Sequence, residues 1–187
     1  MNFIDHSNLK DRHAFLSPSG YHWINYSDEK LITTFQNYAA VERGTMLHQF
    51  AATCIKLGQN LPDTEQTLNR YVNDAIGFGL TPEQVLFYSD NCFGTADAIG
   101  YERDILRIHD LKTGSVPAHM EQLRVYAALF CLEYNKKTVD LDIQLAIYQN
   151  DAVLTEKADS DEIERIMKKI TKFDKLLNKI QTKGVLG

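Results

Sequence analysis

The sequence is poor in cysteine, and its three cysteines lie far apart in a chain of 187 residues. Cys54, Cys92 and Cys131 form no CxxC pair, so one chain builds neither a four-cysteine zinc site nor an iron–sulfur cluster. Each of them stands in apolar surroundings, where a free cysteine behaves as a small hydrophobic side chain. We therefore expect three core cysteines and no disulfide.

Long hydrophobic runs and a signal peptide are missing as well. No stretch approaches the roughly 18 apolar residues of a membrane-spanning helix, and the N-terminal segment MNFIDHSNLKDRH has no apolar core. The sequence therefore predicts a cytoplasmic protein with no membrane partner. A low-complexity linker and an internal repeat are also absent, which indicates one domain over residues 1–187.

Positive charge is in short supply, because 20 Lys and Arg residues face 25 Asp and Glu residues and leave a formal net charge of −5. A chain with this balance is not expected to coat nucleic acid without specificity, although it leaves room for a locally basic groove. The apolar fraction of 44% and the charged fraction of 24% are those of a soluble globular protein, which excludes a disordered chain.

The periodicity of the apolar residues predicts the helices, the strands and their order. Residues 1–16 are polar and predict a mobile arm, and residues 17–80 predict a helical part with Ser17 as a cap and Pro18 in the first turn. Residues 83–150 predict a sheet with one helix, followed by a long C-terminal helix. The expected helices cover 21–26, 28–40 (or a lid), 42–58, 62–80, 119–134 and 159–182, and the expected strands cover 83–90, 93–99, 104–112 and 138–149. This order indicates an α/β fold with a mixed central β-sheet flanked by helices.

Apolar residues spaced three and four apart identify the faces that the long helices bury. Gly58 is expected to end the helix over 42–58, and Gly77 and Gly79 to end the next one. In the C-terminal helix we expect seven apolar side chains to be buried: Ile163, Ile166, Met167, Ile170, Phe173, Leu177 and Ile180.

Acidic residues and a lysine cluster on two neighbouring strands, which residues 100–103 join as an antiparallel hairpin. Asp110 and Lys112 are two apart and therefore point to the same face, and Asp97 approaches them from the partner strand. Two carboxylates and the Leu111 backbone carbonyl are hard oxygen ligands, which suit Mg²⁺ or Mn²⁺. The spacing alone fits a metal site and a surface salt-bridge ladder equally well.

Four short motifs follow one another in order along the chain. They are GTMLH (44–48), GTADAI (94–99), an apolar strand that ends in DLKTG (110–114), and QLRVY (122–126). Together they resemble the catalytic core of the PD-(D/E)XK nuclease superfamily, and more narrowly its RecB-like and Cas4-like branch, which includes small phage exonucleases. The segment LSPS (16–19) is similar to the N-terminal segment of that branch.

The resemblance implies a restriction-endonuclease-like core with a metal held by three side chains. His48, Asp97 and Asp110 would be the ligands, together with the Leu111 carbonyl. By itself His48 reads as a hydrogen-bonded histidine at the edge of the core, and only the full set of motifs makes it a ligand. Asp110 stands where many members of the family carry Glu, a variant that the family tolerates.

The remaining motif residues are implied to act on the substrate beside Asp97 and Asp110. Lys112 would be the catalytic lysine. Gln122 and Tyr126 lie one helical turn apart, so both reach the same side and would hold the active site or a DNA phosphate. The four cysteines that clamp an iron–sulfur cluster in some members are absent, and no cluster is expected.

The implied activity is a Mg²⁺- or Mn²⁺-dependent deoxyribonuclease with one or two ions. It would be an exonuclease of phage or bacterial DNA recombination, repair or processing, located in the cytoplasm of a bacterium or of a phage-infected host cell. DNA, a recombination or replication protein and further copies of the same chain are the partners implied. The alternatives are a catalytically inactive nuclease-like module that binds DNA or a protein, and a structural α/β protein with coincidental motifs.

A basic stripe on the C-terminal helix is the last feature with a predicted role. Its residues recur every three or four positions and share one side of the helix. A solvated helix face and a track for DNA phosphates both account for the stripe. The residues are Arg165, Lys168, Lys172, Lys175 and Lys179.

Overall fold

The computed structural model describes residues 14–184. The chain divides into two compact units, Met1–Thr45 and Met46–Gly187, and each is described by itself. Most of the predicted arm, residues 1–13, lies outside the described residues. Among the described residues no helix is both long enough and apolar enough to cross a membrane.

The first unit contains a short 3₁₀ helix and the beginning of a long α-helix. Ser17 caps η2 (Pro18–Asn25) as predicted, and its hydroxyl accepts a hydrogen bond from the Gly20 amide. The next helix, α1, runs without interruption from Asp28 to Leu57. We expected a separate stretch over 28–40, and this was wrong: the segment holds no proline, and one interior glycine, Gly44, costs a helix only about 1 kcal/mol.

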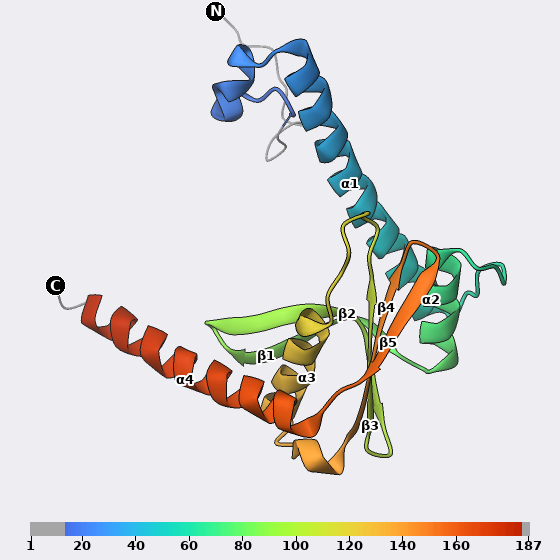
Figure 1. Cartoon of the computed structure of the whole chain (residues 1–187), viewed down its shortest axis with the longest axis vertical. Helices are drawn as coiled ribbons and strands as arrows, with labels where there is room; N and C mark the ends of the chain where they lie inside the picture. The colour runs from blue at the N-terminus through green and yellow to red at the C-terminus, as the bar shows by residue number, and fades with distance from the viewer. Residues whose placement is uncertain (1–13, 185–187) are drawn as a thin grey trace, which may run out of the picture. The chain divides into compact units, whose positions relative to one another are not determined.

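The second unit is built on a five-stranded mixed sheet (Figure 1). The strands lie side by side in chain order, and only β3 and β4 are parallel. Helix α3 (Glu121–Glu133) forms the crossover between these two. The predicted α/β class with a mixed sheet flanked by helices is therefore confirmed. The strands are β1 (Thr81–Ser89), β2 (Cys92–Glu102), β3 (Ile105–Leu111), β4 (Asp142–Gln149) and β5 (Ala152–Lys157).

Two helix or strand starts in the second unit differ from the prediction, and one strand was missed. Helix α2 spans Thr67–Gly77 and begins later than residue 62, because the Asn73 side chain binds both the amide and the carbonyl of Leu61 and holds the preceding chain outside the helix. Strand β4 begins later than residue 138, after the short helix η3 (Thr138–Asp140). Strand β5 was not predicted at all. Its six residues are too few for a clear alternation, but Asn150 and Asp151 before it have positive φ, as in a tight hairpin turn.

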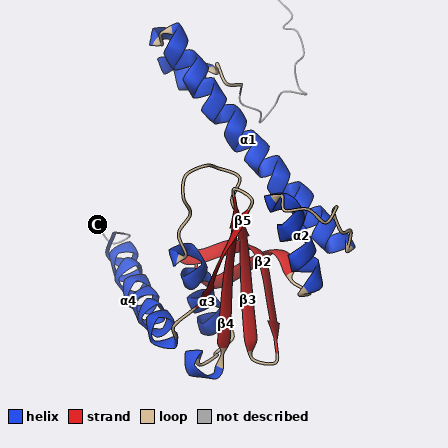
Figure 2. Ribbon diagram, turned by 45° about the vertical axis from the view of Figure 1, so that its right-hand side comes forward, coloured by secondary structure: helices blue, strands red, loops and turns tan. Residues whose placement is uncertain are grey.

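Helices cover both faces of the sheet (Figure 2). Helix α3 and the beginning of α4 (Ser160–Gly184) bury one face, and α2 with the end of α1 buries the other. Cys54 and Cys131 are buried as expected, whereas Cys92 is half-buried.

The burial predicted for the C-terminal helix decreases along its length. Ile163 is fully buried, Ile166, Met167 and Ile170 are half-buried, and Phe173, Leu177 and Ile180 are exposed, so the prediction was wrong for the last three. The reason is length: α4 has 25 residues and its neighbour α3 has 13, so the second half of α4 extends past the end of α3.

Candidate active site

Asp97 on β2 and Asp110 on β3 lie side by side, just beyond the last paired residues of the two strands. Ala98 pairs with His109 in this antiparallel hairpin, so Asp97 and Asp110 occupy the next pair of positions. Asp97 is half-buried, and Asp110 is 2% exposed. The hairpin predicted from the sequence is confirmed, although its turn lies at Arg103 and Asp104, later than expected, where both residues have positive φ.

Asp97 joins the hairpin to helix α1. Its Oδ2 accepts a hydrogen bond of 2.9 Å from the Leu111 amide and lies 3.3 Å from Nδ1 of His48. The hydrogen bond from Asp97 raises the pKa of His48, and the charges of Asp97, Asp110 and Glu83 act in the same direction against burial. The structure thus brings His48 to Asp97, as the motif order implied.

Asp110 is a buried carboxylate with a lysine as its counter-charge. Nζ of Lys112 lies 3.1 Å from Oδ1 and 2.9 Å from Oδ2. Within residues 14–184, Oδ2 still has no well-aligned hydrogen-bond donor. Burial, and then the charge of Asp97, raise the pKa of Asp110 to about 6, although Lys112 and His48 oppose the shift. Burial and the neighbouring carboxylate therefore outweigh the nearby positive groups and disfavour the ionised form of Asp110.

Lys112 begins a chain of hydrogen bonds that ends on β2. Its Nζ donates to Oε1 of Gln122 at 2.9 Å, and Nε2 of Gln122 lies 3.5 Å from the Tyr126 hydroxyl. That hydroxyl donates to the carbonyl of Thr95 at 2.6 Å. Gly94 makes room for the tyrosine, because a Cβ at this position would stand 3.1 Å from Cε1 of Tyr126. The predicted Gln122 and Tyr126 thus fix the position of Lys112 relative to the hairpin.

Glu83 belongs to the site and was missed by the sequence analysis. The β1–β2 register, with Pro82 opposite Ala98, places it opposite Asp97, and its φ is 53°. Ligand atoms of His48, Glu83 and Asp97 all lie within 4.8 Å of one another. An acid at the start of an edge strand carries no signal in the sequence, because the left-handed backbone that turns it toward Asp97 is unusual for glutamate.

Gln149 was also missed, and it holds the loop 112–120 beside the site. From the end of β4 its Nε2 donates to the carbonyls of Gly114 at 2.6 Å and Val116 at 2.8 Å. Its Oε1 accepts from the Ala118 amide at 3.1 Å. Three hydrogen bonds from one side chain therefore tie this loop, which connects Lys112 to α3, to the central sheet.

The donor set fits a hard divalent cation. Carboxylate oxygens and one imidazole nitrogen are ligands that Mg²⁺ and Mn²⁺ accept. The three residues whose ligand atoms lie within 4.8 Å of one another are His48 and Asp97, which were predicted as ligands, and Glu83, which was not. Asp110 is turned to Lys112, and the Leu111 amide is bound to Asp97. Ligation by Asp110 and by the Leu111 carbonyl stays a prediction.

The five predicted DNA-binding residues lie on α4, and within residues 14–184 none of them contacts the residues of the candidate site. Arg165 and Lys168 stand in its first half, and the other three lysines of the stripe in the part that extends past α3. No family model, no curated protein and no solved structure matches this chain.

Proposed function

We propose that the chain is a Mg²⁺- or Mn²⁺-dependent nuclease that hydrolyses phosphodiester bonds in DNA. The observation that carries this proposal is the pair Asp97 and Asp110, with His48 3.3 Å from the first carboxylate and Lys112 2.9 Å from the second. A surface salt-bridge ladder does not account for a carboxylate that is 2% exposed and whose pKa is raised to about 6. A buried carboxyl group next to a second carboxylate, with its ionised form disfavoured in the protein alone, supports a cation site.

The residues of the chain divide the work of hydrolysis among them. His48, Glu83 and Asp97 would hold a cation, with Asp110 beside them. A divalent cation held there would act as a Lewis acid, which stabilises charge on the phosphate and lowers the pKa of a water molecule bound to it. In this arrangement Asp110 also restrains Lys112.

Lys112 is placed to act on the phosphate or on the attacking water. An ammonium group has three N–H donors, and Lys112 directs one of them to Asp110 and one to Oε1 of Gln122. One donor is left for a phosphate oxygen or for the attacking water, with which it shares charge in the transition state. Tyr126 and Gln122 hold the ammonium group in place, so we assign them as positioning residues.

The motif resemblance supports the same reaction and extends it. A restriction-endonuclease-like core of the RecB-like branch would place these residues on a hairpin, a crossover helix and an upstream helix, which is where β2, β3, α3 and α1 carry them. We propose an exonuclease of phage or bacterial DNA recombination, repair or processing on that basis.

The test uses end-labelled single- and double-stranded DNA, linear and circular, with Mg²⁺ or Mn²⁺. We expect cation-dependent cleavage by the parent chain and a loss of at least about 100-fold in Asp110→Asn and Lys112→Met, because each removes a group that acts in the transition state. Asp63→Asn and Lys56→Met are the matched controls, since both residues are exposed and outside the site. Cleavage that is retained in both site variants would contradict the proposal. DNA binding by the parent chain without any cleavage would favour the inactive nuclease-like module.

A further inference from the structure

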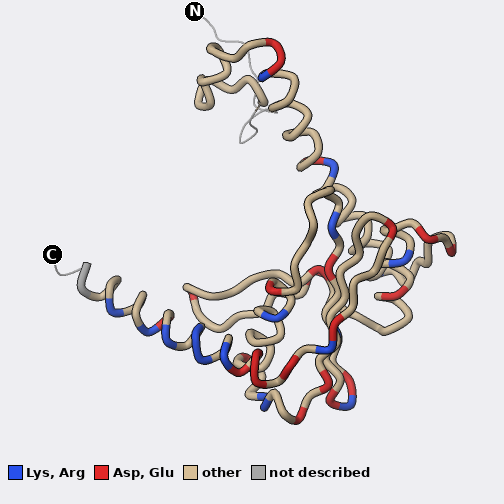
Figure 3. The backbone as a smooth tube through the Cα atoms, viewed as in Figure 1, with Lys and Arg blue, Asp and Glu red and all other residues tan. Residues whose placement is uncertain are grey.

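Helix α4 beyond its first two turns is rich in positive charge, in an otherwise acidic chain (Figure 3). After the acidic first turn and Glu164, the lysines of the predicted stripe follow at 168, 172, 175 and 179, with Lys169 on another side, and Asp174 is the one remaining acid up to residue 182. Because the lysines are three or four residues apart, they share one side of the helix. The apolar residues Phe173 and Leu177 stand on another side.

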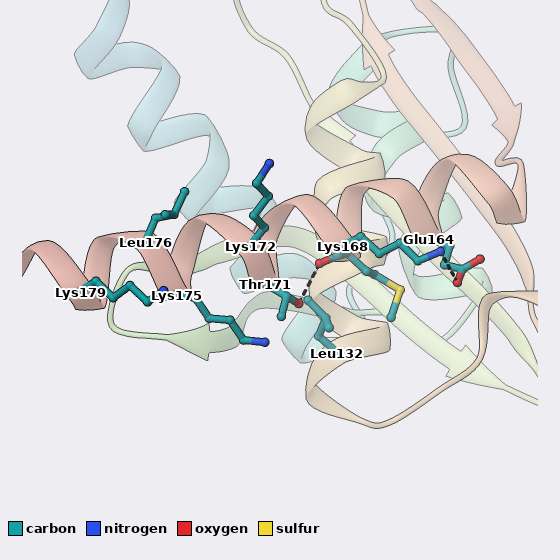
Figure 4. A pocket seen from close by; sticks show the side chains of 9 residues that line it. Leu132, Glu164, Lys168, Thr171, Lys172, Lys175, Leu176 and Lys179 are labelled. Atoms are coloured by element: carbon teal, nitrogen blue, oxygen red, sulfur yellow. Dashed lines mark hydrogen bonds and ion pairs between the residues drawn. The ribbon is translucent and has the colours of Figure 1, made fainter.

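These lysines line a groove and do not simply cover a convex surface. A hollow of about 560 Å³ lies between α4 and the end of α3 at Leu132. Lys168, Lys172, Lys175 and Lys179 all contribute to its lining (Figure 4). Arg165 does not line it, which narrows the predicted stripe to its four lysines.

The charge in this groove is largely uncompensated. Lys168 pairs with Glu164 at 2.8 Å. Among residues 14–182, Lys172, Lys175 and Lys179 have no carboxylate within 4.0 Å, and their ammonium groups donate no hydrogen bond to the protein. Asp174 does not reach them, because its carboxylate accepts from Ser89 Oγ at 2.6 Å and from Asn91 Nδ2 at 2.9 Å at the β1–β2 turn. Three ammonium groups therefore face solvent in one concave tract.

We infer that this groove holds the sugar–phosphate backbone of a polynucleotide, outside the catalytic site. The inference rests on the proposed nuclease function and names a surface that the substrate uses. Lys168 and Lys179 are eleven residues apart, which is about 16 Å along a helix and matches about five phosphates at 3.4 Å per nucleotide of one strand. The groove lacks aromatic residues and amide side chains that read bases, so binding here is independent of sequence.

An anionic membrane is the competing occupant of a basic amphipathic helix. The contacts of α4 favour the polynucleotide. Ile163 is buried in the core on the apolar side, and Asp174 and Asn178 of the same helix bind Asn91 of the β1–β2 turn. Ile163 and these two polar contacts therefore fix α4 to the rest of the fold, while Phe173 and Leu177 stay exposed beside them. A helix held in this way is not free to turn its apolar side into a bilayer, and the vesicle measurement below tests the membrane directly.

The test measures how salt weakens binding of a labelled 20-nucleotide strand to the full chain in the Asp110→Asn background, without divalent cation. Each lost phosphate contact on a single strand lowers the magnitude of the slope of log Kobs against log salt by about 0.7. We expect Lys172→Gln/Lys175→Gln to lower it by about 1.4 for every sequence tried. The control Lys56→Gln/Lys169→Gln removes the same charge from α1 and from another side of α4, and should leave the slope unchanged.

An equal slope in parent and groove variant, with the helix content intact by circular dichroism, would overturn the inference. So would a groove variant that loses binding to phosphatidylserine vesicles and keeps its DNA slope, since the membrane would then be the occupant. Cleavage separates this result from the proposed function: in the chain with Asp110 restored, the groove variant should cut long DNA more slowly and a dinucleotide at the parental rate. A parent that cuts neither fails as a nuclease, while its binding slope still reports on the groove.

Discussion

At the scale of single residues, Asp110 shows how a site is prepared at the expense of stability. Its carboxyl group is buried next to Asp97, and its pKa is raised to about 6 from the ordinary value of 3.8. A raised carboxyl pKa means that the protonated form is favoured in the folded state. The stability that this group contributes is therefore present below about pH 4 and is lost as the pH rises through about 6.

We predict that Asp110→Asn stabilises the metal-free protein while it abolishes cleavage. At pH 8 the parent folds with an ionised, desolvated carboxylate, and the amide has nearly the same shape without the charge. The free energy of unfolding should rise by about 2 kcal/mol. Removing the raised pKa stabilises the fold by about 1.4 kcal/mol per pKa unit, and the loss of the ion pair with Lys112 offsets part of this gain. Urea unfolding in the presence of a chelator measures it. A variant less stable than the parent would contradict the assignment of Asp110 as a strained carboxylate.

His109 forms a second buried polar group, on the opposite side of β3 from Asp110. It is 4% exposed, and its Nδ1 lies 3.2 Å from the Tyr148 hydroxyl, which donates to Asp74 at 2.8 Å. Because this hydroxyl gives its proton to Asp74, Nδ1 of a neutral imidazole is the donor in the second bond. Burial lowers the pKa of His109 to about 4 from 6.5, so the ring is neutral at pH 7.

We predict an acid-sensitive fold that depends on His109. A lowered histidine pKa means that the unfolded chain takes up the proton first, so stability is complete above about pH 6.5 and falls as the pH drops toward 4. The loss from this residue amounts to about 3 kcal/mol by pH 4. His109→Gln should flatten the fall of the unfolding free energy over that window, measured by urea unfolding at several pH values. His119→Gln, at an exposed position, is the control, and an equally steep fall in His109→Gln would refute the assignment.

At the scale of elements, the loop 112–120 determines how well Lys112 is positioned. Gln149 at the end of β4 binds this loop at Gly114, Val116 and Ala118. A parallel β3–β4 pair needs a long crossover, and this loop is the part of the crossover that follows directly on the catalytic strand. The site thus depends on a strand that contributes no catalytic residue.

We predict that Gln149→Ala lowers kcat by about 10- to 100-fold with little effect on the overall fold, because misplaced catalytic groups lose rate on this scale. The three backbone partners become exposed to water, so limited proteolysis should cut the loop 112–120 faster. Gln144→Ala on the same strand is the matched control, since its side chain binds Asp142 and not the loop. Unchanged kcat together with unchanged proteolysis would show that Gln149 does not order the loop.

At the scale of the whole molecule, the site joins three elements that a cation would hold together. His48 comes from α1, Glu83 from β1 and Asp97 from β2. A ligand that binds only this folded arrangement stabilises it by mass action.

We predict that Mn²⁺ or Ca²⁺ raises the Tm of the chain. At a concentration 100 times Kd the gain is about 2.7 kcal/mol, which corresponds to about 5–10 °C for a chain of this size. His48→Ala and Glu83→Gln should each remove most of the shift, and Asp63→Asn should keep it. Thermal unfolding with and without cation provides the measurement, and a Tm that no cation moves would exclude a metal site among these residues.

Much of the local structure could be predicted from the sequence. The hairpin of Asp97 and Asp110 and the helix of Gln122 and Tyr126 follow from alternation and from 3.6-residue periodicity, which are properties of a single segment. Glu83 could not be found in this way, since it depends on a left-handed backbone and on strand register. The exposure of Phe173 likewise depends on how long the neighbouring helix is.

The sequence by itself determined which chemical groups are present and which of them share a strand face or a helix turn: Asp110 with Lys112, and Gln122 with Tyr126. Only the tertiary structure decided that His48 meets Asp97 at 3.3 Å, that Glu83 joins them, and that four lysines line one groove. The physical reason is that backbone geometry sets spacing within an element, whereas the distance between two elements results from the packing of side chains far apart in the chain.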